Sequence, residues 1–106
     1  MTDKKIVLTT TGTREEAGKI ARTLVERRLA ACVNVVAVES VYRWKEAVES
    51  AQEWLLVIKT LETNFSKVCD EIQELHSYEL PECIKLEISG GSRKYLEWIE
   101  KNLVTE

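Results

Sequence analysis

The sequence has little of the two residues that most often interrupt regular structure, with one proline, Pro81, and four glycines among 106 residues. These residues do not gather into a segment of the kind that forms a flexible linker or a low-complexity region. A chain of this length is the usual size of one domain with one hydrophobic core. We therefore expect a single domain over residues 1–106.

Excess positive charge and long apolar runs are also missing. Lys and Arg number 15 against 18 Asp and Glu, for a net charge of −3, and they are scattered without the basic stripe of a nucleic-acid-binding protein. No apolar run approaches the roughly 20 residues of a membrane-spanning helix, and the N-terminus lacks the apolar segment of a signal peptide. We predict a cytoplasmic protein with no nucleic-acid partner and no membrane partner.

Histidine and cysteine are scarce. The single histidine, His76, leaves no candidate for a Ser-His-Asp arrangement, which argues against hydrolytic catalysis. Cys32, Cys69 and Cys83 are odd in number and match the spacing of neither a zinc motif nor a redox pair. In a reducing cytosol we expect all three to be small, buried, apolar side chains.

The most apolar continuous run lies within residues 53–61 and is rich in strand-forming residues. Side chains alternate between the two faces of a strand, so Trp54, Leu56 and Ile58 should share one face. The opposite face is apolar as well. Both faces of this strand therefore need cover.

Hydrophobic periodicity predicts the remaining elements. The expected strands cover 6–10, 30–44 with a bend or bulge after residue 38, 53–61, and 84–88 with one solvent-exposed face carrying Lys85 and Glu87. The polar stretch 45–52 should be the tip of a long hairpin. Helices are expected after Thr13, Thr63 and Ser92, the first opened by a capping box of Thr13 and Glu16.

This order predicts an α+β, ferredoxin-like βαββαβ fold with an added C-terminal helix, in which two helices cover one face of an antiparallel sheet. The first and third strands would be central. The second would be an edge strand that is long and apolar on both faces, which is an aggregation hazard in a monomer. We infer that it pairs with another subunit, with Tyr42, Trp44 and Trp54 as aromatic anchors of that contact.

Several separate motifs, in order and in register, are similar to those of the CutA divalent-cation tolerance proteins. They are Ala31–Asn34, Ser40–Trp44, Glu49, Glu53, Ile58–Thr60, His76–Glu82 and Tyr95–Trp98. The resemblance implies a ferredoxin-like subunit, a tight homotrimer built by the extended hairpins, a link to divalent metal (copper) tolerance, and a fold shared with trimeric nitrogen-regulatory signalling proteins.

The chain differs from the family pattern at informative positions. Glu46 stands where glycine is usual near the hairpin tip, Ser77 where proline is common, and Cys83 where an aliphatic residue is usual. Members proposed to bind copper have a cysteine and two adjacent histidines at the positions of Thr10 and Leu75–His76. The resemblance therefore does not carry a complete copper site.

His76 is the sharpest metal-ligand candidate, but one imidazole is not enough for a copper or zinc site. Cys69 lies seven residues earlier, about 10 Å along a helix axis, too far to share one ion. A site would need Cys32, Glu79, Glu82 or acidic residues of another subunit. The alternative is a histidine favoured by the dipole at a helix C-terminus.

Other candidates also have two interpretations. Lys59 interrupts an apolar strand, and it either pairs with a carboxylate such as Glu49 or Glu53 or holds a small anion. Aromatic residues either line a ligand pocket at a subunit boundary or pack in the trimer contact: Tyr42, Trp44 and Trp98.

The sequence thus supports a non-enzymatic trimeric binding or signalling protein that requires no cofactor and can take copper, another divalent cation or a small anion. The alternatives are a structural or interaction trimer with incidental metal binding, or an enzyme acting on a small anionic metabolite. The candidate ligand-binding residues are Tyr42, Trp44, Glu49, Lys59, His76, Tyr78, Glu79 and Trp98, with His76 as the metal ligand.

Overall fold

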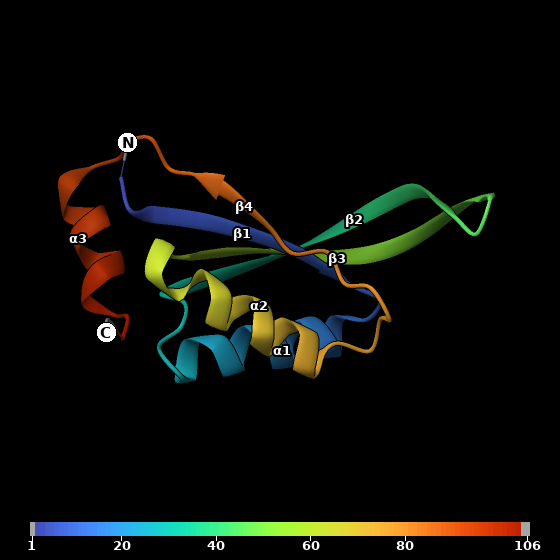
Figure 1. Cartoon of the computed structure of the whole chain (residues 1–106), viewed down its shortest axis with the longest axis horizontal. Helices are drawn as coiled ribbons and strands as arrows, with labels where there is room; N and C mark the ends of the chain where they lie inside the picture. Colours follow the sequence, from blue (N-terminus) through green and yellow to red (C-terminus); the bar gives the residue numbers. More distant parts are fainter. Residues whose placement is uncertain (1, 105–106) are drawn as a thin grey trace.

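The structure is a computed structural model that describes residues 2–104. Its elements follow the predicted order (Figure 1). They are β1 (Lys4–Thr11), α1 (Arg14–Glu26), β2 (Cys32–Trp44), β3 (Ala47–Leu61), the short 3-10 helix η1 (Glu62–Asn64), α2 (Phe65–Leu75), β4 (Ile84–Glu87) and α3 (Arg93–Lys101).

The four strands form one antiparallel sheet in the order β2-β3-β1-β4. This confirms that the first and third strands are central and that the second and fourth are edges. Helices α1 and α2 lie together on one face of the sheet, and α3 lies at the end of the sheet farthest from the tip of the β2-β3 hairpin (Figure 1). The molecule is elongated, with principal extents of 44 × 25 × 21 Å.

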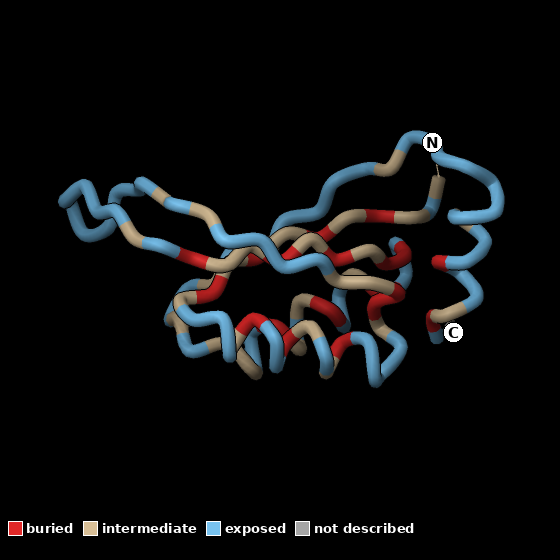
Figure 2. The backbone as a smooth tube through the Cα atoms, turned by 180° about the vertical axis from the view of Figure 1, so that it is seen from behind, coloured by how far each residue is buried: buried red, intermediate tan, exposed pale blue. Residues whose placement is uncertain are grey.

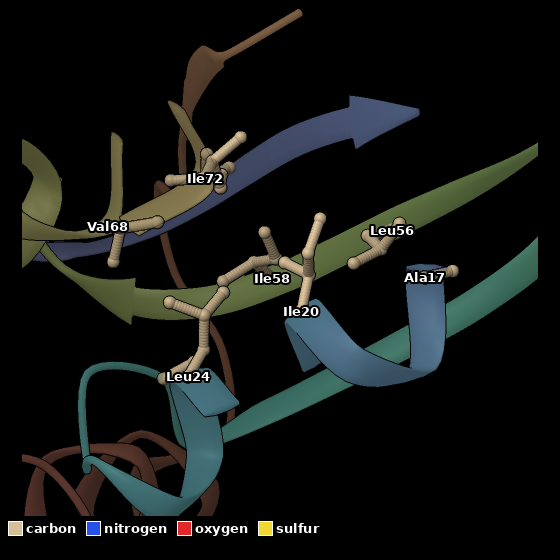
Figure 3. Packing of buried hydrophobic residues seen from close by; sticks show 9 residues of the cluster. Ala17, Ile20, Leu24, Leu56, Ile58, Val68 and Ile72 are labelled. Carbon is tan, nitrogen blue, oxygen red and sulfur yellow. The ribbon is translucent and has the colours of Figure 1, made fainter. Parts of the chain in front are cut away.

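The main core fills the space between the sheet and the two helices (Figure 3). Leu56 and Ile58 of β3 point into it, as predicted, and meet Ile20 of α1 and Ile72 of α2, all fully buried. Val25 of α1 is 41% exposed and lies outside this core. A second small cluster joins α3 to the sheet through Ile99 and Leu103.

Two predicted helix caps need correction. The Thr13 hydroxyl does accept a hydrogen bond from the Glu16 amide at 3.1 Å, but the Glu16 carboxylate does not return to the cap. It accepts hydrogen bonds from the amide and hydroxyl of Ser77, at 2.6 and 3.0 Å. Thr63 does not cap α2, because it lies inside η1 and Asn64 precedes the helix.

The β2-β3 hairpin is longer and more regular than predicted. Every residue from Cys32 to Trp44 pairs with β3 in one unbroken register, so there is no bulge after residue 38. Residues 47–52 are strand rather than tip, and the tip is the two-residue turn Lys45–Glu46. The hairpin extends well beyond the end of β1 and is exposed over most of that length (Figure 2).

Both residues of the hairpin turn have positive φ, 49° at Lys45 and 69° at Glu46. Two-residue hairpin turns of this kind favour glycine, because a side chain in the left-handed region costs about 1–2 kcal/mol. We expect Glu46→Gly to raise the free energy of unfolding by about 1 kcal/mol in a denaturant titration. Glu49→Gly, within β3, is the matched control and should lower it; equal effects would contradict the turn assignment.

Cys69 of α2 and Cys83 before β4 form a disulfide, with Cα atoms 6.3 Å apart. This corrects the prediction of three unpaired cysteines; only Cys32 is free in the described part of the chain. The sequence did not indicate the pairing because the two residues are 14 positions apart and meet only after α2 has turned back toward the sheet. The disulfide closes the segment 76–82 into a loop.

The face of the sheet opposite α1 and α2 remains largely uncovered. Val7 points into the core, and its β4 partner Lys85 therefore lies on the helix side, 4.7 Å from the ring of Phe65. Ile84 and Leu86 lie on the open face and are 48% and 45% exposed. The apolar side of β4, predicted to be its buried side, thus lies on an uncovered surface.

Candidate functional site

A cleft of about 640 Å³ lies between the β2-β3 hairpin, from Ser40 to Trp44 near its tip, and the segment 76–82. The hairpin contributes one wall and the loop that follows α2 contributes the other. Thr10, near the end of β1, also lines the cleft. The lining residues are Thr10, Ser40, Val41, Tyr42, Trp44, Glu53, Tyr78, Glu79, Leu80 and Glu82. This volume is in the range of small-molecule sites.

Glu53 and Tyr78 join the two walls. Glu53 is only 6% exposed, and its carboxylate accepts a 2.7 Å hydrogen bond from the Tyr78 hydroxyl. Burial and this hydrogen bond raise the pKa of the Tyr78 hydroxyl above its ordinary value, so it remains a donor at neutral pH. The Tyr78 ring also lies close to Gly12, where a Cβ would come within 3.1 Å of the hydroxyl oxygen.

His76 anchors the loop wall. Its side chain is fully buried, and Nε2 lies 2.6 Å from the carbonyl oxygen of Thr10. Because a carbonyl only accepts, Nε2 carries the proton. Nδ1 accepts a hydrogen bond from the Tyr78 amide at 3.1 Å. Both ring nitrogens are thus engaged, and the imidazole has no lone pair free for a metal ion in this conformation.

The structure brings together half of the predicted ligand residues. Tyr42, Trp44, Tyr78 and Glu79 line the cleft. Glu49 lies beside Tyr42 on the exposed hairpin but outside the cleft. His76 lies behind the loop wall, in contact with the lining residues Thr10 and Tyr78.

Lys59 and Trp98 lie apart from this cleft. Lys59 is six residues beyond Glu53 along β3, about 20 Å at the rise of a strand, and its ammonium donates to Asn34 Oδ1 at 2.6 Å. The predicted pairing with Glu49 or Glu53 is therefore wrong. Trp98 stacks on Tyr95 at 5.4 Å on α3, at the other end of the molecule (Figure 1).

Several lining residues were not among the predicted ligand residues, chiefly Glu53 and Glu82. Glu53 is a family-motif residue and a predicted partner of Lys59, but not a predicted ligand residue. The available signal was its place in β3 next to Trp54, which pairs with the last residue of β1, since a carboxylate there is buried by whatever packs over the end of β1. Glu82 depends on the path of the loop after Pro81, which periodicity does not describe.

The residues of one chain do not fit a copper or zinc site. Within the described residues no group of three His, Cys, Asp or Glu side chains converges as metal ligands would. The only imidazole is engaged at both nitrogens. The prediction that His76 is a metal ligand is therefore not supported by its environment and stays a prediction.

The model of the CutA1 divalent ion tolerance proteins matches residues 5–102. The chain belongs to this family. It is 44% identical over 100 residues to the divalent-cation tolerance protein CutA of Thermus thermophilus, covering 93% of this chain and 97% of that protein. The crystal structure of CutA1 from Oryza sativa superimposes with a TM-score of 0.94 at 36% identity, covering 97% of this chain and 95% of that one.

Family relatives differ in length and in location. The chloroplastic protein CutA of Arabidopsis thaliana is 43% identical over 98 residues, which cover 92% of this chain but 54% of that protein. The family membership confirms the resemblance seen in the sequence and the α+β fold with its four-stranded antiparallel sheet. In the described part of this chain, no helix has the length and hydrophobicity needed to cross a membrane.

Proposed function

We propose that the protein is a homotrimeric, non-enzymatic binding protein of the divalent-cation tolerance type, with its ligand site in the cleft between the hairpin and the segment 76–82. The cleft carries this proposal, because it gathers aromatic and carboxylate side chains from three parts of the chain. Among the described lining residues, the one hydroxyl hydrogen-bonded to a carboxylate is that of Tyr78, and its pKa is raised rather than lowered, which is the opposite of an activated nucleophile. Binding is therefore the function that the cleft supports best.

Two surfaces support assembly with further copies. The open face of the sheet exposes the apolar side of β4, and the outer edge of β2 presents unpaired backbone groups along a long strand. The hairpin adds exposed Val41 and Val48 beyond the sheet. A monomer rarely leaves so much contiguous apolar surface exposed, and a trimer built through the hairpins would cover it.

Copper or another divalent cation would need ligands that one chain does not bring together. The carboxylates of Glu79 and Glu82 lie in the cleft and are available to a site shared between subunits. His76 would have to give up its hydrogen bond from the Tyr78 amide to join them. The proposed function therefore does not depend on a metal cofactor.

The cytoplasmic location stays a prediction. The name of the Arabidopsis relative places that protein in the chloroplast. The Cys69–Cys83 disulfide favours a compartment or an organism in which disulfides persist. Fractionation of the source cells would decide between the cytoplasm and a compartment in which disulfides persist. Thiol trapping in the same fractions would report whether Cys69 and Cys83 are oxidised.

The test of the proposed function is calorimetric titration of the metal-stripped protein with copper, zinc, small anions and small organic cations. We expect saturable binding of at least one of these probes, weakened at least tenfold by Glu53→Gln. His76→Ala separates the metal prediction, since only a ligand at His76 would be lost in that variant while the trimer persists in light scattering. No binding of any probe would contradict the proposal and favour a structural or interaction trimer.

A further inference from the structure

We propose that the cleft takes an organic cation, an ammonium or guanidinium group carried on a small apolar body. This deepens the proposed function and rests on it, since it names the ligand class of the same cleft. The argument comes from the charge of the lining, the burial of Glu53, and the aromatic rings that line the same cleft.

The lining is acidic and has no cationic side chain among the described residues. Glu53, Glu79 and Glu82 contribute three carboxylates, and the other lining residues are neutral. Glu53 is the decisive one because it is nearly buried. Its carboxylate is held only by the neutral Tyr78 hydroxyl, and no Lys, Arg or His of the described chain forms an ion pair with it.

A buried carboxylate without a counter-charge is costly, and a charged partner that enters the site removes that cost. The cleft at Glu53 therefore favours a ligand that brings positive charge. Lys59, the basic residue predicted to lie beside it, is directed to Asn34. No basic side chain of the described chain supplies a positive charge beside Glu53, so we assign that charge to the ligand.

Three aromatic residues, Tyr42, Trp44 and Tyr78, line the same space. Aromatic faces attract alkylammonium and guanidinium groups, and cages of such rings with a carboxylate recognise these cations in other proteins. The Trp44 ring already attracts one within the chain, because the exposed Lys45 ammonium lies 5.8 Å from its centroid. A ligand cation bound at this ring would take the place of the Lys45 ammonium.

The size and lining favour an organic cation over a bare metal ion. About 640 Å³ is far more than one ion and its ligands fill, and Val41 and Leu80 add apolar contact area. A metal ion needs several oxygen, nitrogen or sulfur atoms at about 2 Å, and no such group converges in the described residues. An ammonium group needs only one carboxylate and the rings.

The test uses calorimetric titration of the full-length, metal-stripped protein with choline and butylammonium. Their neutral comparison is 3,3-dimethylbutan-1-ol, which has the shape of choline without its charge. We expect both cations to bind saturably and with competition between them. The neutral alcohol should bind at least tenfold more weakly, since one charge-assisted contact is worth about that factor.

Matched variants locate the site. Glu53→Gln keeps an acceptor for Tyr78 and removes only the charge, and Trp44→Leu removes the ring; each should weaken choline binding roughly tenfold. Glu49→Gln, on the hairpin outside the cleft, and Trp98→Leu, on α3, should leave it unchanged. Trp44 and Trp98 are each 42% exposed, so Trp98→Leu is a matched control for Trp44→Leu. Light scattering on every variant verifies that assembly is intact.

Four results would overturn the inference. Equal affinity for the neutral alcohol would mean that the cleft recognises apolar shape alone. Binding unchanged by Glu53→Gln would move the cation elsewhere. Binding of copper, zinc or an anion that depends on Glu53, with no binding of either ammonium probe, would refute the organic cation while leaving the proposed function standing. If no probe of any class binds, both fail.

Discussion

Removing the Cys69–Cys83 disulfide should lower the free energy of unfolding by about 3 kcal/mol, the value expected for a closed loop of about 15 residues. The disulfide joins the middle of α2 to the residue before β4. It therefore restricts the conformations of the unfolded chain in the segment that contains the loop 76–82. Denaturant titration of Cys69→Ala with Cys83→Ala, against the unchanged chain, measures this loss.

Cys32→Ala is the matched control, because Cys32 is free and half-buried in β2. It should cost about 1 kcal/mol or less, as expected for a small truncation at a partly exposed site. All titrations need one protein concentration, since unfolding of an oligomer depends on it. Equal stability of the double variant and the unchanged chain, or no effect of dithiothreitol on the latter, would contradict a disulfide that stabilises the fold.

The order of elements and the strand arrangement were predictable because local signals and topology agree. The continuous apolar run around Leu56 and Ile58 indicates a buried strand, and the helical spacing of Ile20 and Leu24 indicates a helix that covers it. Once the six elements follow the order βαββαβ, the ferredoxin-like topology determines which strands are central and which are at the edges. The family motifs then agree with the same fold.

The errors lie where a residue's environment comes from chain segments far apart in sequence. Residues 47–52 are polar, and we interpreted them as a tip, but pairing across the hairpin keeps them in a strand. Glu16 has a closer partner in Ser77 than in its own helix cap. Lys85 lies between apolar residues of β4, a pattern that predicts a solvent-facing side chain. Its ammonium instead pairs with Glu62 on the helix side of the sheet.

The candidate site could be predicted only in part for the same reason. Tyr42 and Trp44 were predictable as aromatic residues on a long extended strand, and Tyr78 and Glu79 as members of the His76–Glu82 motif. The buried charge of Glu53 arises from the loop after α2 folding over the end of β1, held by His76 and Thr10. No local pattern encodes that contact, which depends on a loop closed by a disulfide.

Replacing Trp44 by aspartate should lower the assembly state of the protein from the proposed trimer toward monomer. Trp44 and Val48 lie near the tip of the hairpin, where it extends past β1 and β3 has no partner other than β2. Trp44 is 42% and Val48 66% exposed in one subunit. In the proposed trimer the cleft lies at the subunit boundary, so Trp44 borders both the ligand space and the contact. A charge placed at this boundary would be desolvated without a partner, which costs several kcal/mol at each copy of the interface.

Val48→Asp tests the opposite face of the hairpin tip without touching the cleft, because Val48 pairs with Arg43 and does not line the cleft. Val25→Asp is the control, since Val25 is a similarly exposed valine on the outer side of α1. Multi-angle light scattering over a range of concentrations should show dissociation of both hairpin variants and a trimer for the α1 variant. If both hairpin variants stay trimeric, the hairpin does not build the assembly, and the open face of the sheet must do so alone.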